Sequence, residues 1–301
     1  QELWIMPSHK WKQMRFNWKN YFMNRRKFIK TTAAFSAASM LSMGGLTRAF
    51  AAPIGNVGIQ LYTIRNMMAE NMEASLAQVA EIGYKEVEFF NYYGRSARDV
   101  KAMIDQNGLV SPSIHVNIDQ LRGDALKATI EYAATMDQKY ITLAWLGEEN
   151  RKSMDQYKRN AELFQAVGEQ CNKAGINFAY HNHEFEFKPF DGVKPYDMLL
   201  EQLSDDIMVM EMDLFWIIEA GHDPFEYFDK YPGRFHMCHV KDRREDGEMV
   251  YVGNGAIDFN AILAKASHAG LKHFFVEHDT PGDEVQMMIT SYDTAKGFMI
   301  S

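Results

Sequence analysis

The amino-acid sequence predicts an α/β protein, a single-domain (β/α)8 TIM barrel that follows an N-terminal signal peptide. After Ala51 the chain has 250 residues left, close to the usual size of such a barrel. Short apolar runs alternate there with segments of helical period, which is typical of parallel βα units. Ionisable residues gather where the apolar runs end, and a barrel of this type carries its chemistry at the carboxyl ends of its strands.

The beginning of the chain has the composition of an export signal. Residues 1–51 hold nine Lys or Arg and one acidic residue, and residues 24–30 read NRRKFIK. An Ala/Ser/Met-rich stretch, Thr31–Met43, and the small-residue site Ala49–Ala51 follow, which is the order of a signal peptide. Paired arginines before a Phe resemble the twin-arginine type. We therefore expect a signal peptide over residues 23–51 and an exported, periplasmic protein.

Residues 1–22 do not fit this pattern. Trp4, Trp11 and Trp18 lie among basic residues there, and Met23 stands where a signal peptide would begin. We expect this segment to be a misplaced upstream start, and we assign it no fold.

Charge and composition exclude several kinds of partner. The net charge is −8, and without residues 1–51 it is 23 − 39 = −16, so the body lacks the clustered Lys and Arg that nucleic acids need. No apolar run reaches the roughly 18 residues that a membrane-spanning helix needs. We therefore expect no membrane association once the signal peptide is removed. Cys171 and Cys238 are too few for a disulfide framework or a Cys-rich metal site, and we expect two core thiols.

Eight apolar runs are candidate strands of the barrel. The main alternative, an open doubly wound sheet, usually carries a glycine-rich phosphate loop after its first strand. Here the first strand continues into Leu61–Arg65, which contains no glycine. The candidate strands are Val57–Tyr62, Tyr84–Phe90, Ser111–Val116, Tyr140–Trp145, Ile176–His183, Ile207–Leu214, Phe235–Val240 and His273–His278.

Helical patterns separate these strands, and several end at a glycine in the position of a C-cap. The helical stretches are Met72–Ile82, Ala97–Gln106, Ala125–Met136 and Tyr157–Lys173, and the capping glycines are Gly83, Gly108, Gly175 and Gly270.

Six of the eight candidate strands end in an acid or an imidazole. Buried charges are costly unless they are paired or bound to a metal, so a ring of such groups indicates a cation. Carboxylates and imidazoles without sulfur suit Mn2+, Mg2+, Co2+ or Zn2+. The strand-end residues are Glu88, His115, His181, His183, Glu184, Glu186, Glu211, Asp213, His239, Lys241, Asp242, Glu277, His278 and Asp279.

The alternation of side chains along a strand predicts which of these groups meet. His181 and His183 share one face of their strand, and Glu211 and Asp213 share one face of the next. Each residue also has a purely structural interpretation. Asp213, for example, could cap the following turn, and Glu277 could pair with a nearby lysine or arginine.

Taken together, these segments resemble the xylose-isomerase-like TIM barrels, often called sugar phosphate isomerase/epimerase proteins. The resemblance covers roughly residues 54–300, and its motifs are specific for the superfamily rather than for a substrate. The segments that carry it are Gly58–Arg65, Tyr180–Phe187, Met212–Trp216, His239–Asp242, Val252–Gly255 and Val276–Asp279.

The resemblance implies one divalent metal ion held by a Glu, an Asp, a His and a Glu on strands five to eight. Asp213, His239 and Glu277 match three of these positions. The fifth-strand position falls on His181, where the epimerases have a carboxylate. His183 and Glu186 are the alternatives for that ligand.

The activity that the resemblance implies is a metal-dependent sugar isomerase or epimerase that acts through an enediolate, with a small sugar or sugar derivative as the substrate. Glu277 and either His183 or Glu186 would share the proton transfer, and Lys241 would stabilise the oxyanion. The side chains expected to line the sugar site are Tyr62, Glu88, His115 and Trp216.

Three other functions stay open or are disfavoured. The same chemistry would allow a lyase or hydrolase that acts on 3-keto-glycosides by β-elimination, a role that export favours. A sugar-binding protein without catalysis is the alternative of another class. An endonuclease-IV-like phosphodiesterase is disfavoured because the body is acidic. Such barrels commonly self-associate, and the sequence leaves homo-oligomerisation open, along with the metal's identity and the substrate.

Overall fold

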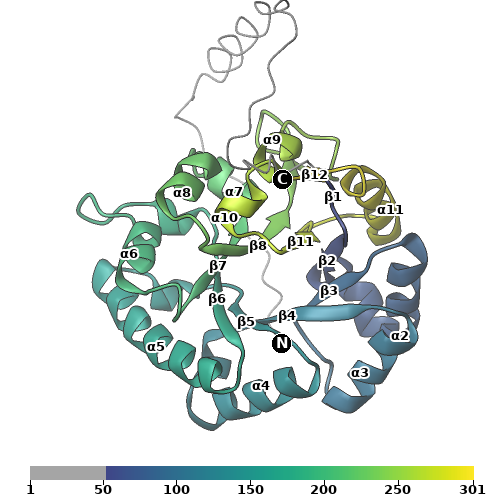
Figure 1. Cartoon of the computed structure of the whole chain (residues 1–301), viewed down its shortest axis with the longest axis horizontal. Coiled ribbons are helices and arrows are strands. Elements are labelled where there is room, and N and C mark those ends of the chain that lie inside the picture. The colour runs from purple at the N-terminus through teal and green to yellow at the C-terminus, as the bar shows by residue number, and fades with distance from the viewer. Residues whose placement is uncertain (1–51) are drawn as a thin grey trace, which may run out of the picture. The chain divides into compact units, whose positions relative to one another are not determined.

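The computed structural model describes residues 52–301, so the predicted signal peptide and upstream segment lie outside the described residues. Eight parallel strands form a closed barrel, in which the last strand pairs with both its predecessor and the first strand (Figure 1). The barrel strands, in order around the barrel, are β2 (Gly58–Gln60), β3 (Glu86–Phe89), β4 (Val110–Val116), β5 (Tyr140–Leu143), β6 (Asn177–His181), β7 (Val209–Asp213), β8 (Phe235–Val240) and β11 (His273–Val276).

The predicted fold class is confirmed, and each candidate strand overlaps one strand of the barrel, with β4 beginning one residue before its candidate, at Val110. The strand Phe235–Val240 has the predicted bounds, whereas most of the others are shorter. The fifth strand ends at His181 rather than His183 because the His183 N–H donates to the Glu186 carboxylate instead of continuing the ladder.

Helices surround the barrel (Figure 1). The helix Ala97–Gln106 has the predicted bounds, and the four capping glycines all have positive φ, between 63° and 125°. The helices are α2 (Arg65–Ile82), α3 (Ala97–Gln106), α4 (Gly123–Thr135), α5 (Met154–Lys173), α6 (Pro195–Gln202), α7 (Leu214–Glu219), α8 (Pro224–Lys230), α9 (Phe259–Leu263), α10 (Ala266–Ala269) and α11 (Glu284–Ala295).

Short elements follow several strands and shape the end of the barrel that carries the ionisable residues. Two antiparallel pairs lie outside the barrel. The short elements are the 3-10 helices η1 (Leu61–Ile64), η2 (Ile118–Leu121), η3 (Glu148–Asn150) and η4 (Phe185–Phe187), and the paired strands β1 (Ala52–Pro53) with β12 (Met299–Ile300) and β9 (Asp242–Arg243) with β10 (Met249–Val250).

The core has two parts. The larger one lies between the barrel and its helices, and both cysteines are buried and free, as expected. Inward-facing residues of five strands form a smaller cluster that fills the barrel interior. The barrel is therefore not a pore. Among residues 52–301, no helix combines the length and the apolar character needed to cross a membrane. The smaller cluster consists of Tyr140, Ala179, Val209, Met237 and Phe275.

Candidate metal centre

Four of the predicted residues meet at the carboxyl ends of adjacent strands. His181 ends β6, Asp213 ends β7, His239 lies on β8 and Glu277 directly follows β11. One ligand atom from each lies within 4.8 Å of those of the other three, and no residue of the four is more than 5 % exposed. We call these four residues the outer group. It is the set that the family resemblance implies, with His181 in the fifth-strand position.

Asp213 caps a helix with one carboxylate oxygen and contributes the other to the outer group. The helix-capping role and the metal-ligand role of this residue are therefore compatible. Its Oδ1 accepts a hydrogen bond from the Trp216 N–H at the start of α7, at 2.9 Å. Its Oδ2 lies 3.3 Å from His181 Nε2. The Asp213 N–H donates to Asn182 Oδ1 at 3.0 Å, which fixes the backbone at this strand end.

The His181 ring is oriented by the backbone. Its Nδ1 lies 2.9 Å from the carbonyl oxygen of Ala144, a distance at which Nδ1–H donates and Nε2 is left as the free ligand atom. Metal-binding histidines are commonly oriented in this way by a second hydrogen bond. The chemistry and the spacing of the outer group therefore fit a divalent cation.

Glu186, the alternative fifth-strand ligand, lies outside the outer group. Its carboxylate accepts hydrogen bonds from the Tyr180 hydroxyl and from the His183 N–H, each at 2.8 Å. Burial raises the pKa of Glu186 to about 8, in spite of these two donors. The short helix η4 turns this side chain back toward β6 rather than toward the cation site.

A buried lysine supplies positive charge to the outer group. Lys241 Nζ lies 2.8 Å from Asp213 Oδ2 and 2.6 Å from Glu277 Oε2, and it also contacts Asp279 at 3.0 Å. Burial raises the pKa values of Asp213 and Glu277, but Lys241 and the imidazoles outweigh it and hold both pKa values well below the ordinary range. Both carboxylates are therefore charged, as metal ligands must be.

His183 lies beside the outer group with one ring nitrogen that has no partner among the described residues. Its ring packs edge-on against His181, parallel to Phe185, and 5.6 Å from Trp216. His183 Nδ1 and Trp216 Nε1 are buried without a hydrogen-bond partner. Burial, followed by the charges of His181 and Lys241, lowers the pKa of His183 well below its ordinary value, so the ring is a neutral base.

Aromatic rings with an arginine against them follow two of the barrel strands, β2 and β6. Tyr62, predicted to line the sugar site, is 39 % exposed after β2, with Arg65 4.3 Å from its ring centroid. The Arg151 guanidinium lies 3.5 Å from the ring centroid of Phe185. Arg151 is in the loop after β5, so a pattern of ionisable residues at strand ends does not point to it.

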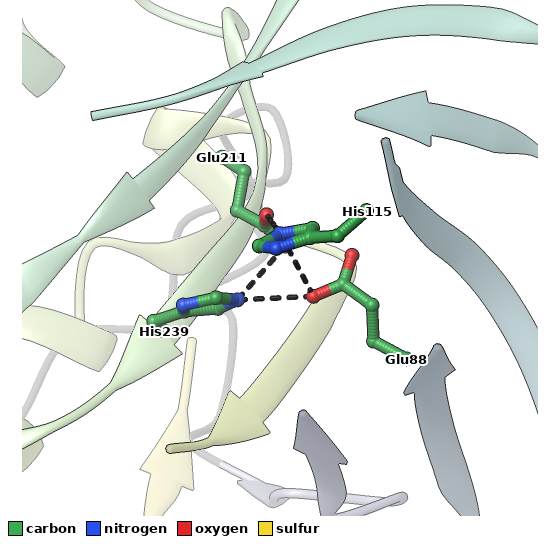
Figure 2. A group of neighbouring side chains, drawn as sticks. All are labelled: Glu88, His115, Glu211 and His239. Atoms are coloured by element: carbon green, nitrogen blue, oxygen red, sulfur yellow. Dashed lines mark hydrogen bonds and ion pairs between the residues drawn. The ribbon is translucent and has the colours of Figure 1, made fainter. Parts of the chain in front are cut away.

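Glu88 and His115, predicted to bind substrate, form a second set with Glu211 and His239 (Figure 2). The four ligand atoms again lie within 4.8 Å of one another, and we call these residues the inner group. Glu211 is two residues before Asp213 on the same face of β7, or roughly 6.6 Å further into the barrel. His239 belongs to both groups, with Nδ1 toward Glu277 and Nε2 toward Glu88.

Asp242, in the same motif as His239, has a structural role. Its carboxylate accepts hydrogen bonds from the N–H groups of Gly253, at 2.9 Å, and Gly255, at 3.0 Å. A Cβ at Gly255 would come within 2.1 Å of Asp242 Oδ1, so a side chain there would disrupt this contact. The segments His239–Asp242 and Val252–Gly255 therefore stabilise each other's position.

Residues 76–296 match the xylose isomerase-like TIM barrel family. The chain belongs to this family. It is 22 % identical over 229 residues to the inosose dehydratase of Geobacillus kaustophilus (strain HTA426), covering 63 % of this chain and 74 % of that protein.

Two solved structures extend the comparison. A sugar phosphate isomerase/epimerase from Parabacteroides distasonis ATCC 8503 is 26 % identical, with a TM-score of 0.68 over 80 % of this chain and 96 % of that one. The IOLI protein with a bound zinc atom is 14 % identical, with a TM-score of 0.63 over 80 % of this chain and 95 % of that one. Family membership supports an enzyme that modifies a small sugar-like molecule.

Proposed function

We propose that this protein is a metal-dependent lyase that removes a leaving group from a keto sugar or keto-cyclitol by β-elimination. The observation that carries the proposal is a ring nitrogen beside the outer group that has no hydrogen-bond partner in the described part of the chain. His183 Nδ1 is buried, neutral and without a partner beside the outer group. The second carboxylate that the isomerases and epimerases use is replaced by His181 in the fifth-strand position. An elimination can proceed with one base, whereas epimerisation needs groups on both faces of the sugar.

Each residue of the site would have a defined role in the elimination. A divalent cation bound by the outer group would polarise the ketone and acidify the neighbouring C–H. His183 Nδ1 takes that proton, a C=C bond forms, and the C–O bond on the next carbon breaks. His183 then delivers the proton to the departing oxygen, so the products are an unsaturated ketone and water or an alcohol. The Lys241 ammonium stabilises the negative charge that develops on oxygen.

The curated relative supports this reaction class. Inosose is a keto-cyclitol, and loss of water beside a ketone is a β-elimination. The sequence analysis placed the isomerase or epimerase first and the lyase second. The imidazole at position 181 and the dehydratase relative together favour the lyase.

An isomerase or epimerase is the second candidate, favoured by the likeness to the Parabacteroides distasonis protein. One experiment separates the candidates. The purified protein is incubated with Mn2+ or Zn2+ in D2O and offered an inosose and a 3-keto-glycoside, and the products are followed by NMR. An unsaturated ketone with release of water or the aglycone supports the lyase. Deuterium uptake without release would replace it with the isomerase, and binding without either reaction would leave the sugar-binding alternative.

We also propose that the protein is exported through the twin-arginine route. The support is the basic, apolar and small-residue order of residues 23–51. The full chain is produced in a bacterium that has this route, alongside a variant in which Arg25 and Arg26 are both lysine. We expect the parent in the periplasmic fraction and the variant in the cytoplasmic one. Equal export of the two would exclude this route.

A further inference from the structure

The inner group connects opposite sides of the barrel. Glu88 and His115 come from the neighbouring strands β3 and β4, and Glu211 and His239 come from the neighbouring strands β7 and β8. In the closed strand order, β5 and β6 separate the two pairs on one side and β11 and β2 on the other. The four side chains converge in the barrel interior, and none is more than 6 % exposed (Figure 2).

The spacing of the four side chains matches a small coordination sphere. His115 Nε2 lies 2.6 Å from Glu211 Oε2 and 3.2 Å from Glu88 Oε2. His239 Nε2 lies 3.0 Å from Glu88 Oε2 and 3.5 Å from Glu211 Oε1. Ligand atoms about 2.0–2.1 Å from a tetrahedral Zn2+ are separated by about 3.3 Å. Three of the observed separations lie within 0.3 Å of that value, and the His115–Glu211 separation of 2.6 Å is shorter.

The charge of the inner group lacks a permanent cation. In the described part of the chain, the ion pairs of Glu88 and Glu211 are with imidazoles only, and neither pairs with a Lys or an Arg. Glu88 Oε1 and Glu211 Oε1 are buried without a hydrogen-bond partner. Buried carboxylates in such surroundings are costly unless a cation or further donors compensate them.

We propose that Glu88, His115, Glu211 and His239 form a second, closed divalent-cation site of the type that Zn2+ favours, inside the barrel beneath the outer group. Two imidazoles and two carboxylates without sulfur suit Zn2+ or Mn2+, and four protein ligands leave no open position, which is typical of a structural site. His239 would bridge the two cations as an imidazolate, with Nε2 in the inner site and Nδ1 in the outer one, and its ring N–H proton would be released to solvent when both cations bind. The inner cation would tie β3 and β4 to β7 and β8 across the barrel.

The competing arrangement is a hydrogen-bonded network without a metal. Gln60 Nε2 donates to Glu88 Oε2 at 2.8 Å, and each imidazole could donate to a carboxylate. The network predicts no metal ion in the inner group, whereas the metal site predicts one. Metal content can be measured without knowing the substrate.

The test is the number of metal ions per chain. The full chain is purified without chelators, titrated with Zn2+, dialysed against metal-free buffer and analysed by mass spectrometry of its elements. We expect two ions per chain in the parent and one in Glu211→Gln and in Glu88→Gln. Asp213→Asn, which changes the outer group, is expected to retain one. Glu86→Gln is the matched control, because Glu86 is on the same strand as Glu88 but pairs with His273 outside both groups.

Thermal unfolding gives a second readout that is independent of activity. A cation that binds only the folded chain raises Tm, so the parent should gain more from Zn2+ than Glu211→Gln does. Circular dichroism identifies a variant that fails to fold. In that case the number of metal ions bound by the parent chain decides whether the inner site exists. One ion per chain in the parent, or the same count in the parent and Glu88→Gln, overturns the inner site and leaves the proposed lyase untouched.

Discussion

The outer and inner groups use the same kinds of ligand and share His239, yet their surroundings differ. The outer group comes from the adjacent strands β6, β7, β8 and β11 and lies beside Lys241 and the His183 ring. The inner group spans the barrel, and within residues 52–301 the ionic partners of its carboxylates are imidazoles alone. The ligand set alone therefore does not separate a catalytic site from a structural one. What differs is the neighbouring side chains, since Lys241 and His183 lie beside the outer group and imidazoles supply the positive charge of the inner one.

The largest expected effect tests the outer group alone. Glu277→Gln removes a charged ligand and a partner of Lys241, and we expect turnover to fall about 1,000-fold, since the Lewis acid contributes several kcal/mol. Steady-state assays on the substrate found in the NMR screen, with metal analysis, would measure it. The exposed acid Glu248 provides the control Glu248→Gln. Full activity in Glu277→Gln would contradict the role of this residue.

A change beside the outer group should separate catalysis from metal binding. We expect His183→Ala to lower kcat about 100- to 1,000-fold, the range for loss of a general base, without loss of metal. Metal content and kcat are measured on the same preparation. Loss of metal from this variant would instead make His183 the fifth-strand ligand in place of His181.

A residue behind the outer group should have a smaller effect. Asn182→Ala removes the acceptor for the Asp213 N–H, and loss of such an orienting contact typically weakens metal affinity about 10- to 100-fold. Competition with a chelator of known affinity measures this change. Asn177→Ala, at the other end of β6, is the matched control. Equal affinities in the two variants would show that Asn182 does not orient the ligand.

The last prediction concerns the stability of the fold rather than the metal site, through Glu186, a buried acid outside both groups. Its pKa is about 8 in the folded chain, above the ordinary carboxyl value near 4.5, so the folded state holds a proton that the unfolded state releases between these pH values. The free energy of unfolding should therefore fall as pH rises from about 4.5 to about 8, by at most about 1.4 kcal/mol per unit. Denaturant unfolding at several pH values measures the slope. Glu186→Gln should be flatter than the parent, and an identical slope would contradict this assignment.

Local pattern was enough to predict most of the fold. Apolar runs and capping glycines depend on neighbouring residues, so the candidate strands and the four glycines with positive φ could be predicted directly. Strand ends were less accurate. The ladder of β6 ends at His181 because the Glu186 side chain takes up the next free N–H, a contact that alternation does not reveal.

The sequence by itself determined the barrel, the kinds of ligand and the strand ends that carry them, because these follow from short-range periodicity and from the rule that parallel strands end on one side. Only the tertiary structure decided which groups meet. Glu88 and His239 are 151 positions apart, and their 3.0 Å contact depends on closure of the barrel. The separation of Asp213 from Glu211 into an outer and an inner group depends on depth along β7. The contact and the difference in depth both arise only when the eight strands close around one axis, so neither can be derived from the individual residues.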